Sequence, residues 1–229
     1  SRFVGPVVFK SEIQKMLNDD EKKVDVERLE QLYPEDYVRL GSPFSNILEL
    51  VLAKRANVPF ENAFAFGSRT LPLISVLLVA KEEKVTVWYE SEKGKKGSIL
   101  TSRQKQMLSE LYGCEYMETF GETYDDDDDD DSTLVIRVVE DLREENAHKD
   151  TKFDAKIDRN GMLYVLNTTK IPLQDIKDGK GKMITEGIHT IRKRLGGPPP
   201  TPDSIRRLRN IVNGNDDEGE VAPDVDELK

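Results

Sequence analysis

A polar turn, Gly67-Ser68-Arg69-Thr70, separates two apolar segments and is the first place where this sequence could do chemistry. A turn between a strand and a helix can bind a phosphate, because the free N–H groups at the helix N-terminus face the anion. Ser68 and Thr70 add hydroxyl groups, and Arg69 adds a cation. Glu90 follows Gly67 by 23 positions, near the spacing at which dinucleotide-binding folds place a ribose-binding acid. One interpretation is therefore a cofactor site formed by these five residues.

The same turn also suits a purely structural role. The dinucleotide fingerprint has three glycines, and its second glycine lets the backbone approach the pyrophosphate. Here the turn has one glycine, position 69 holds Arg, and Pro72 removes an N–H group that a phosphate would use. We therefore favour a structural turn and no cofactor, and keep a nucleotide or S-adenosylmethionine as the alternative.

Basic side chains gather between residues 177 and 209, which hold nine Lys or Arg against three acids. Two helical stretches carry the densest groups, "RKR" and "RRLR". Each of these side chains could neutralise a phosphate and so give salt-dependent, sequence-tolerant binding to nucleic acid. They could also be solvated helix faces that balance nearby acids. The candidate nucleic-acid-binding residues are Arg192, Lys193, Arg194, Arg206, Arg207 and Arg209.

Acidic residues form two further groups. Glu122 and Asp125–Asp131 place eight negative charges within ten residues, and residues 216–229 hold seven acids against one Lys. Adjacent like charges repel each other, so the run of Asp favours an open, solvated loop over a specific metal site. We expect both acidic segments to compete with nucleic acid for the basic helices.

The counts of cysteine and histidine exclude most other chemistry. One cysteine, Cys114, cannot form an internal disulfide or a thiolate metal cage, and it suits a reducing interior. Two histidines leave little scope for zinc or triad chemistry. We expect a buried Cys114, no catalytic residue, no metal site and an intracellular location, cytoplasmic or nuclear.

Strands and helices alternate in the middle of the chain. The apolar periodicity predicts a strand "NAFAF", a helix from Thr70 to about residue 83, a strand "KVTVWYE", a helix opened by the capping box of Thr101 and Gln104, and a strand "CEYMET". Such alternation predicts parallel strands joined by right-handed crossovers, with "NAFAF" beside "KVTVWYE". Asn160-Gly161 predicts a hairpin further along.

These elements predict an α/β fold. The layout resembles a Rossmann-like open sheet, β-α-β-α-β over about 60–140, with an N-terminal helical segment and a C-terminal hairpin plus basic helices. The predicted units are a helical segment at 1–58, an α/β core at 59–176 with an acidic loop at 122–131, a basic helical segment at 177–212 and a disordered acidic tail at 213–229.

Composition and charge complete the hypothesis. The chain is 37% hydrophobic and 34% charged with a net charge of −10, which fits a folded core with solvated extensions. No apolar run is long enough for a bilayer, and we expect no signal peptide. The favoured function is a non-catalytic module of a nucleic-acid-handling assembly, with protein and nucleic-acid partners and no membrane. The alternatives are a group-transfer enzyme that uses the Gly67 turn, and a protein scaffold.

Overall fold

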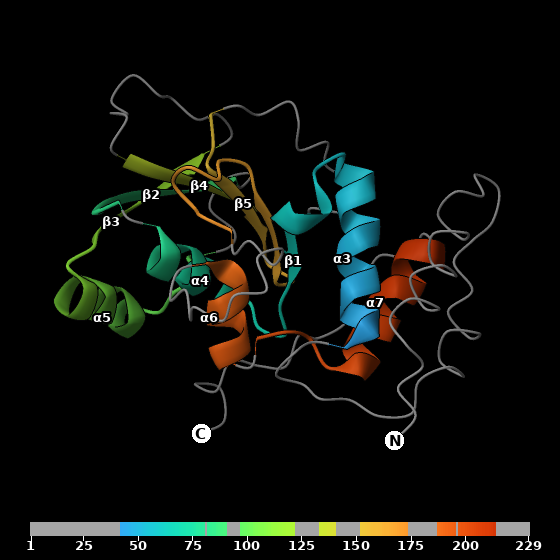
Figure 1. Cartoon of the computed structure of the whole chain (residues 1–229). Coiled ribbons are helices and arrows are strands. Elements are labelled where there is room, and N and C mark those ends of the chain that lie inside the picture. Colours follow the sequence, from blue (N-terminus) through green and yellow to red (C-terminus); the bar gives the residue numbers. More distant parts are fainter. Residues whose placement is uncertain are drawn as a thin grey trace, which may run out of the picture.

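The computed structural model describes residues 42–80, 82–90, 97–121, 133–140, 152–173, 187–195 and 197–213. The expectations for residues 1–41, for the acidic loop at 122–131 and for the tail after residue 213 fall outside these ranges. The described elements form one mixed α/β unit with a six-stranded sheet (Figure 1).

The described elements follow one another along the chain. In order they are α3 (Pro43–Ala56), the 3-10 turn η2 (Phe60–Asn62), β1 (Ala63–Ala65), α4 (Leu71–Val79), β2 (Lys84–Glu90), α5 (Ser102–Tyr112), β3 (Glu115–Gly121), β4 (Thr133–Val139), β5 (Ala155–Asp158), β6 (Met162–Val165), α6 (Ile188–Leu195) and α7 (Thr201–Asn213).

Local capping signals define where α3 and α5 begin and end. The Ser42 side chain accepts a hydrogen bond from the N–H of Ser45 at the start of α3. At the start of α5, Thr101 and Gln104 cap each other's backbone N–H groups, and Gly113 ends the helix with a φ of 66°. These caps confirm the helix predicted to open at Thr101, and they place the start of α3 at Ser42-Pro43.

The strand order of the sheet differs from the prediction. The order is β1-β6-β5-β4-β2-β3. Strand β2 pairs in parallel with β3 and β4, and β4 pairs in parallel with β5, whereas β6 is antiparallel to β5 and to β1. The mixed α/β class is confirmed. The expected pairing of "NAFAF" with "KVTVWYE" is wrong, because the β5–β6 hairpin and β4 lie between β1 and β2.

Helices cover both faces of the sheet (Figure 1). On one side, which we call the first face, α4, α5 and α6 contribute to the larger apolar core through residues such as Leu73, Val76, Leu108 and Ile188. On the second face, α3 and α7 pack over β1 and β6. None of the helices in the described part of the chain is long and apolar enough to cross a membrane.

The β5–β6 hairpin confirms the turn predicted at Asn160-Gly161. Gly161 has a φ of 84°, which favours glycine. The Asp158 carboxylate accepts hydrogen bonds from the N–H groups of Asn160 and Met162, so the turn is closed by its own side chain. The hairpin therefore positions Arg159, which precedes the turn pair, at one end of the sheet.

Candidate functional site

Four strands of the sheet, β2, β3, β4 and β5, run in the same direction and end at what we call the carboxyl edge. After β2 the chain passes to the first face, where Ile99 and Leu100 join the larger core. Just before β5 the chain is described again on the second face, where Phe153 packs with Trp88 and Val135. In open α/β sheets, ligands bind beyond the carboxyl ends of the strands.

Arg159 lies at the carboxyl edge and joins three parts of the chain. Its Nε donates to the Glu140 carboxylate at 3.0 Å, and its Nη2 donates to the carbonyl oxygen of Gly97 at 2.9 Å. Its guanidinium carbon lies 5.8 Å from the centre of the Tyr89 ring, and Phe120 stacks on the same ring at 4.8 Å. The Arg159 side chain is 17% exposed and that of Glu140 is 47% exposed. Arg159 is thus a sheltered cation with a more accessible carboxylate partner.

A second arginine, Arg137 of β4, lies near the same end of the sheet on the second face. Its Nη2 donates to the Glu90 carboxylate at 2.6 Å. Its guanidinium lies 5.5 Å from the ring centre of Trp88 and 5.8 Å from that of Phe153, and these two rings stack on each other. Both arginines therefore combine an aromatic contact with an ion pair to a more exposed glutamate.

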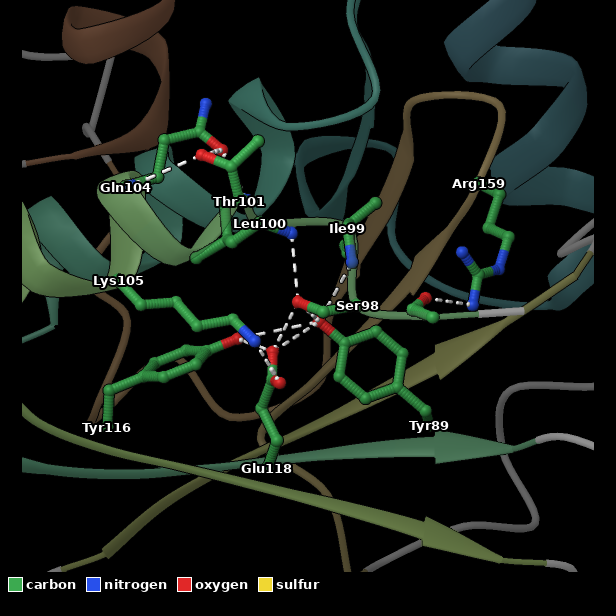
Figure 2. Close-up of polar contacts among 11 residues, drawn as sticks. Tyr89, Ser98, Ile99, Leu100, Thr101, Gln104, Lys105, Tyr116, Glu118 and Arg159 are labelled. Carbon is green, nitrogen blue, oxygen red and sulfur yellow. Dashed lines mark hydrogen bonds and ion pairs between the residues drawn. The ribbon is translucent and has the colours of Figure 1, made fainter. Parts of the chain in front are cut away.

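Hydroxyl groups surround the Glu118 carboxylate on the first face (Figure 2). Its Oε1 accepts hydrogen bonds from the hydroxyl of Tyr116 at 2.7 Å, from that of Tyr89 at 3.1 Å and from that of Ser98. Its Oε2 accepts from Lys105 Nζ of α5. We call these five residues the Glu118 cluster.

The Glu118 cluster also holds residues 98–100, which precede α5, against the sheet. The N–H of Ile99 donates to the Tyr89 hydroxyl at 3.2 Å, and the N–H of Leu100 donates to Ser98 Oγ at 3.0 Å. The next residue is Thr101, the N-cap of α5. Because the Tyr89 hydroxyl is held in this way, the Tyr89 ring beside Arg159 has a fixed orientation (Figure 2).

The pKa shifts in the Glu118 cluster have clear physical causes. Burial alone would raise the pKa of Glu118, but hydrogen bonds from Lys105, Ser98 and Tyr116 outweigh it and hold the pKa below its usual range. Burial raises the pKa of Tyr116, with smaller contributions from Tyr89 and Glu118, and burial also raises the pKa of Tyr89. A carboxylate held ionised by four donors is a weak base, so the cluster supports the site structurally.

The structure separates the Gly67 turn from Glu90. Three strands, β6, β5 and β4, lie between β1 and β2. The N–H of Gly67 donates to the carbonyl oxygen of Gly197 at 2.9 Å. A Cβ atom at position 67 would meet Pro199 Cα at 3.5 Å. The chain at 197–200 therefore covers the turn where a phosphate would have to approach the backbone.

The other residues of this turn bond to one another. The Ser68 and Thr70 hydroxyls lie 3.1 Å apart, and the N–H of Thr70 donates to Ser68 Oγ at 3.2 Å. Thr70 precedes α4 but makes no side-chain cap bond to it, and the Arg69 side chain is exposed. The turn is thus a bend between β1 and α4 whose polar groups are used internally.

Two of the six expected nucleic-acid contacts lie inside the protein. Arg192 forms an ion pair with Glu49 of α3 and donates to the carbonyl oxygen of Ala65 at 3.2 Å. Arg207 donates to the carbonyl oxygen of Phe66 at 3.1 Å and is likewise buried. Their guanidinium groups attach α6 and α7 to β1 and its end, so they cannot face a phosphate backbone.

The remaining basic residues of the prediction also lie on α6 and α7. Arg206 pairs with Asp203 on its own helix at 3.3 Å. Arg194 and Arg209 are exposed. The side chain of Lys193 falls outside the described part of the protein.

Cys114 lies directly before β3, at the opposite end of the sheet from the carboxyl edge. It is a buried free thiol, as expected, and burial raises its pKa, which disfavours the nucleophilic thiolate. Within the described ranges, no group of three or more His, Cys, Asp or Glu residues could hold a metal ion.

No protein-family model matches the chain, and no curated protein matches it either. Some solved structures resemble the chain distantly. An O-acetylhomoserine (thiol)-lyase from Campylobacter jejuni, solved with N'-pyridoxyl-lysine-5'-monophosphate, is 14% identical with a TM-score of 0.48, and the match covers 81% of this chain and 61% of that one. A cystine C–S lyase solved with cysteine persulfide is 12% identical with a TM-score of 0.43, covering 94% of this chain and 70% of that one.

A cysteine desulfurase from Thermococcus onnurineus is 12% identical with a TM-score of 0.35, covering 91% of this chain and 66% of that one. The expectation of a non-catalytic nucleic-acid module, with a nucleotide or S-adenosylmethionine as the alternative cofactor, is wrong. Arg192 and Arg207 are internal, and the Gly67 turn is covered. Similarities this distant do not assign a cofactor or a reaction to this chain.

Pyridoxal phosphate bonds to a lysine amine, and we find no such amine beside the arginines of the described carboxyl edge. Lys105 Nζ is bonded to Glu118, and Lys170 Nζ donates to the carbonyl oxygen of Thr133 at the start of β4. Lys156 of β5 is fully buried. The described residues therefore do not fit that cofactor.

Sequence reasoning missed both arginines of the carboxyl edge. Arg137 interrupts the otherwise apolar strand "TLVIRVV", and Arg159 directly precedes the hairpin turn Asn160-Gly161. A charge inside an apolar strand is costly unless it has a partner, so Arg137 did carry a signal. The sequence carried no signal for the pairing of Arg159 with Glu140 and Gly97, because that pairing depends on the strand order.

Proposed function

We propose that the protein binds a small molecule with an anionic group at the carboxyl edge, between β2 and β4. The observation that carries this proposal is the placement of Arg159. Its side chain is only 17% exposed and lies at the carboxyl edge, where open α/β sheets bind ligands. Its carboxylate partner Glu140 lies nearer to solvent.

The relative exposure of the two partners favours an anionic ligand over a cationic one. Arg159 contacts Tyr89 and Gly97 as well as Glu140, so moving the arginine breaks several interactions. Moving Glu140 transfers to water a carboxylate that is already 47% exposed, whereas Arg159 would have to leave a sheltered position. A ligand carboxylate or phosphate would therefore take the place of Glu140 on Arg159.

The described nucleophiles do not support a covalent reaction at this edge. The Ser98 hydroxyl donates to Glu118, and Cys114 lies at the other end of the sheet. The residues that meet at the carboxyl edge can bind and orient an anion. We therefore state the function as binding.

Thermal unfolding with butyrate or inorganic phosphate tests this proposal. A ligand at 100 times its dissociation constant stabilises a protein by about 2.7 kcal/mol, which in a chain of this size is a rise of several degrees in Tm. The Arg159→Gln variant should lose this rise, because a hydrogen bond between charged groups contributes roughly 1.5–3 kcal/mol.

Arg69→Gln is the matched control. Arg69 is exposed and lies beyond β1, at the far side of the sheet from β2. It should keep the full rise in Tm. An unchanged rise in Arg159→Gln would disprove the site.

A further inference from the structure

Helix α4 has no polar face, although one of its sides is not buried. Its sequence, LPLISVLLV, contains no charged residue, and its single polar residue, Ser75, is buried. Leu73, Val76 and Val79 pack into the larger core. Four further apolar side chains are only half-buried, namely Leu71, Ile74, Leu77 and Leu78. A surface helix normally turns a polar stripe to solvent, so the half-buried side of α4 suits contact with another apolar surface.

Helix α5 carries a second apolar strip. Leu108 packs into the larger core, and Lys105 reaches Glu118 of β3. Met107 and Leu111, one turn apart, are 45% and 65% exposed. At about 100° per residue, they lie on the opposite flank of Leu108 from Lys105. The strip therefore faces away from β3, toward the middle of the sheet.

The neighbour of α5 on that side is α4. Helix α5 contacts β3 at one end of the sheet, and His189 of α6 packs against Phe64 of β1 at the other end. Helix α4 lies between α5 and α6 and packs against α6 (Figure 1). Its half-buried side is therefore turned toward α5. Together with Met107 and Leu111 it forms an exposed apolar surface, which we call the α4–α5 surface, and such surfaces mark interaction sites.

Two charged residues of opposite sign border the apolar strip of α5. Arg103 lies one turn before Met107, and Glu110 directly precedes Leu111. Both charged side chains are exposed, and Glu110 accepts a hydrogen bond from Gln106 of its own helix at 2.7 Å. A second α5 that lay antiparallel along this strip would place its Glu110 beside Arg103 and its Arg103 beside Glu110. A parallel one would oppose like charges.

We infer that the α4–α5 surface binds the same surface of a second copy of this chain, with the two α5 helices antiparallel. Such a contact has a two-fold axis between the α5 helices, so each interaction occurs twice. The apolar strips cover each other, and two Arg103–Glu110 pairs flank them. This inference does not depend on the anion site at the carboxyl edge.

The size of the α4–α5 surface indicates how stable this dimer is. The two helices are roughly 14 and 17 Å long. The contact therefore belongs with interfaces that bury less than about 1,200 Å² in total, which are typical of transient complexes. We expect a weak dimer whose population rises with concentration.

Sedimentation velocity of the whole chain measures this dimer. The native protein should shift from monomer toward dimer as its concentration rises from micromolar to millimolar. Leu111→Asp should weaken the dimer about tenfold or more, because it places a charge inside the apolar strip. Leu111 is 65% exposed, so this variant should fold. Met117→Asp is the control, since Met117 is 46% exposed on β3, outside the α4–α5 surface, and the variant should keep the dimer.

Charge exchange tests the antiparallel arrangement. Arg103→Glu and Glu110→Arg each oppose like charges twice across the interface, so each variant alone should weaken the dimer about tenfold. An equimolar mixture of the two should recover native dimerisation, because one copy then carries two acids and the other two bases at these positions. The double variant should recover it as well. Circular dichroism checks that every variant is folded.

Other occupants of the α4–α5 surface give different results. A native protein that stays monomeric at millimolar concentration would overturn the inference. In that case, a loss of stability in Leu111→Asp would point to another segment of the same chain on this surface, and an unchanged stability would point to a different protein. A dimer that persists in Leu111→Asp, or a mixture of the two charge variants that stays monomeric, would also contradict the proposed contact.

Discussion

Glu49 of α3 and Arg192 of α6 are 143 positions apart in the sequence and form an ion pair inside the protein. Their side chains are 2% and 5% exposed. The Glu49 carboxylate also accepts from the N–H of Ala65 at 2.9 Å. Burial raises the pKa of Glu49, and Arg192 and the Ala65 N–H oppose that rise. The pair joins helices from both faces of the sheet at β1.

Removing one partner of this pair should destabilise the fold severely. Arg192→Met leaves a buried carboxylate without its cation, and breaking a buried pair in this way costs about 3–5 kcal/mol. The free energy of unfolding from urea titrations measures the loss. The double variant Glu49→Leu with Arg192→Met should recover much of it, because no uncompensated charge remains. Arg194→Met, at an exposed position of the same helix, should change stability by about 0.5 kcal/mol or less.

The outcome for Arg192 separates its two interpretations. A surface arginine that binds nucleic acid would give a folded Arg192→Met protein of normal stability. That result would contradict the buried ion pair.

The Glu118 cluster should make stability depend on pH in the acid range. Since the pKa of Glu118 is lowered in the folded protein, its ionised form contributes stability above the unfolded pKa of about 4.3. This contribution is lost as the pH falls through the lower folded value. Urea titrations of the native protein and of Glu118→Gln at pH 7 and at successively lower pH should show a difference that shrinks with acidification.

Glu61→Gln is the control for this experiment, because Glu61 is exposed on η2 and far along the chain from the cluster. The comparison with Glu61→Gln separates the loss of the cluster's carboxylate from the loss of one negative charge. A difference between the native protein and Glu118→Gln that stays constant from neutral to acid pH would show that the Glu118 charge is not selectively stabilised by folding.

The three glycines at positions 161, 113 and 97 should differ in their tolerance of alanine. A Cβ at Gly161 would lie 2.8 Å from the carbonyl oxygens of both Phe66 and Ser68, and its φ is also positive. At Gly113 the φ is 66° but nothing lies within 4 Å, and at Gly97 there is open space. A non-glycine residue in the left-handed conformation costs roughly 1–2 kcal/mol. We therefore expect Gly113→Ala to lower the free energy of unfolding by about that amount and Gly161→Ala to lower it by more. Gly97→Ala should lower it least.

Thermal unfolding of the three alanine variants measures this order. A Gly161→Ala protein as stable as Gly97→Ala would mean that the hairpin turn does not approach the end of β1. At this close approach the N–H of Phe66 donates to the carbonyl oxygen of Gly161 at 2.7 Å. Gly161 therefore also supports the pairing of β1 with β6.

The sequence by itself determined the local elements of this protein. Ser42, Thr101 with Gln104, and Gly113 define helix ends through contacts within a few residues, and Asn160-Gly161 defines the hairpin in the same way. The alternation of apolar strands and helices was enough to predict a mixed α/β fold. These features depend on short-range geometry, which residue type and spacing encode directly.

Tertiary structure alone decided the strand order, and with it the site. Nothing in the pattern of "NAFAF" showed that it would pair with the hairpin strand β6, which moves the Gly67 turn away from Glu90. The same order brings Arg159 to Tyr89, 70 positions earlier in the chain, and buries Arg192 against Glu49. A basic residue has the same identity on a surface or in an ion pair, so its exposure depends on partners that only the folded chain supplies.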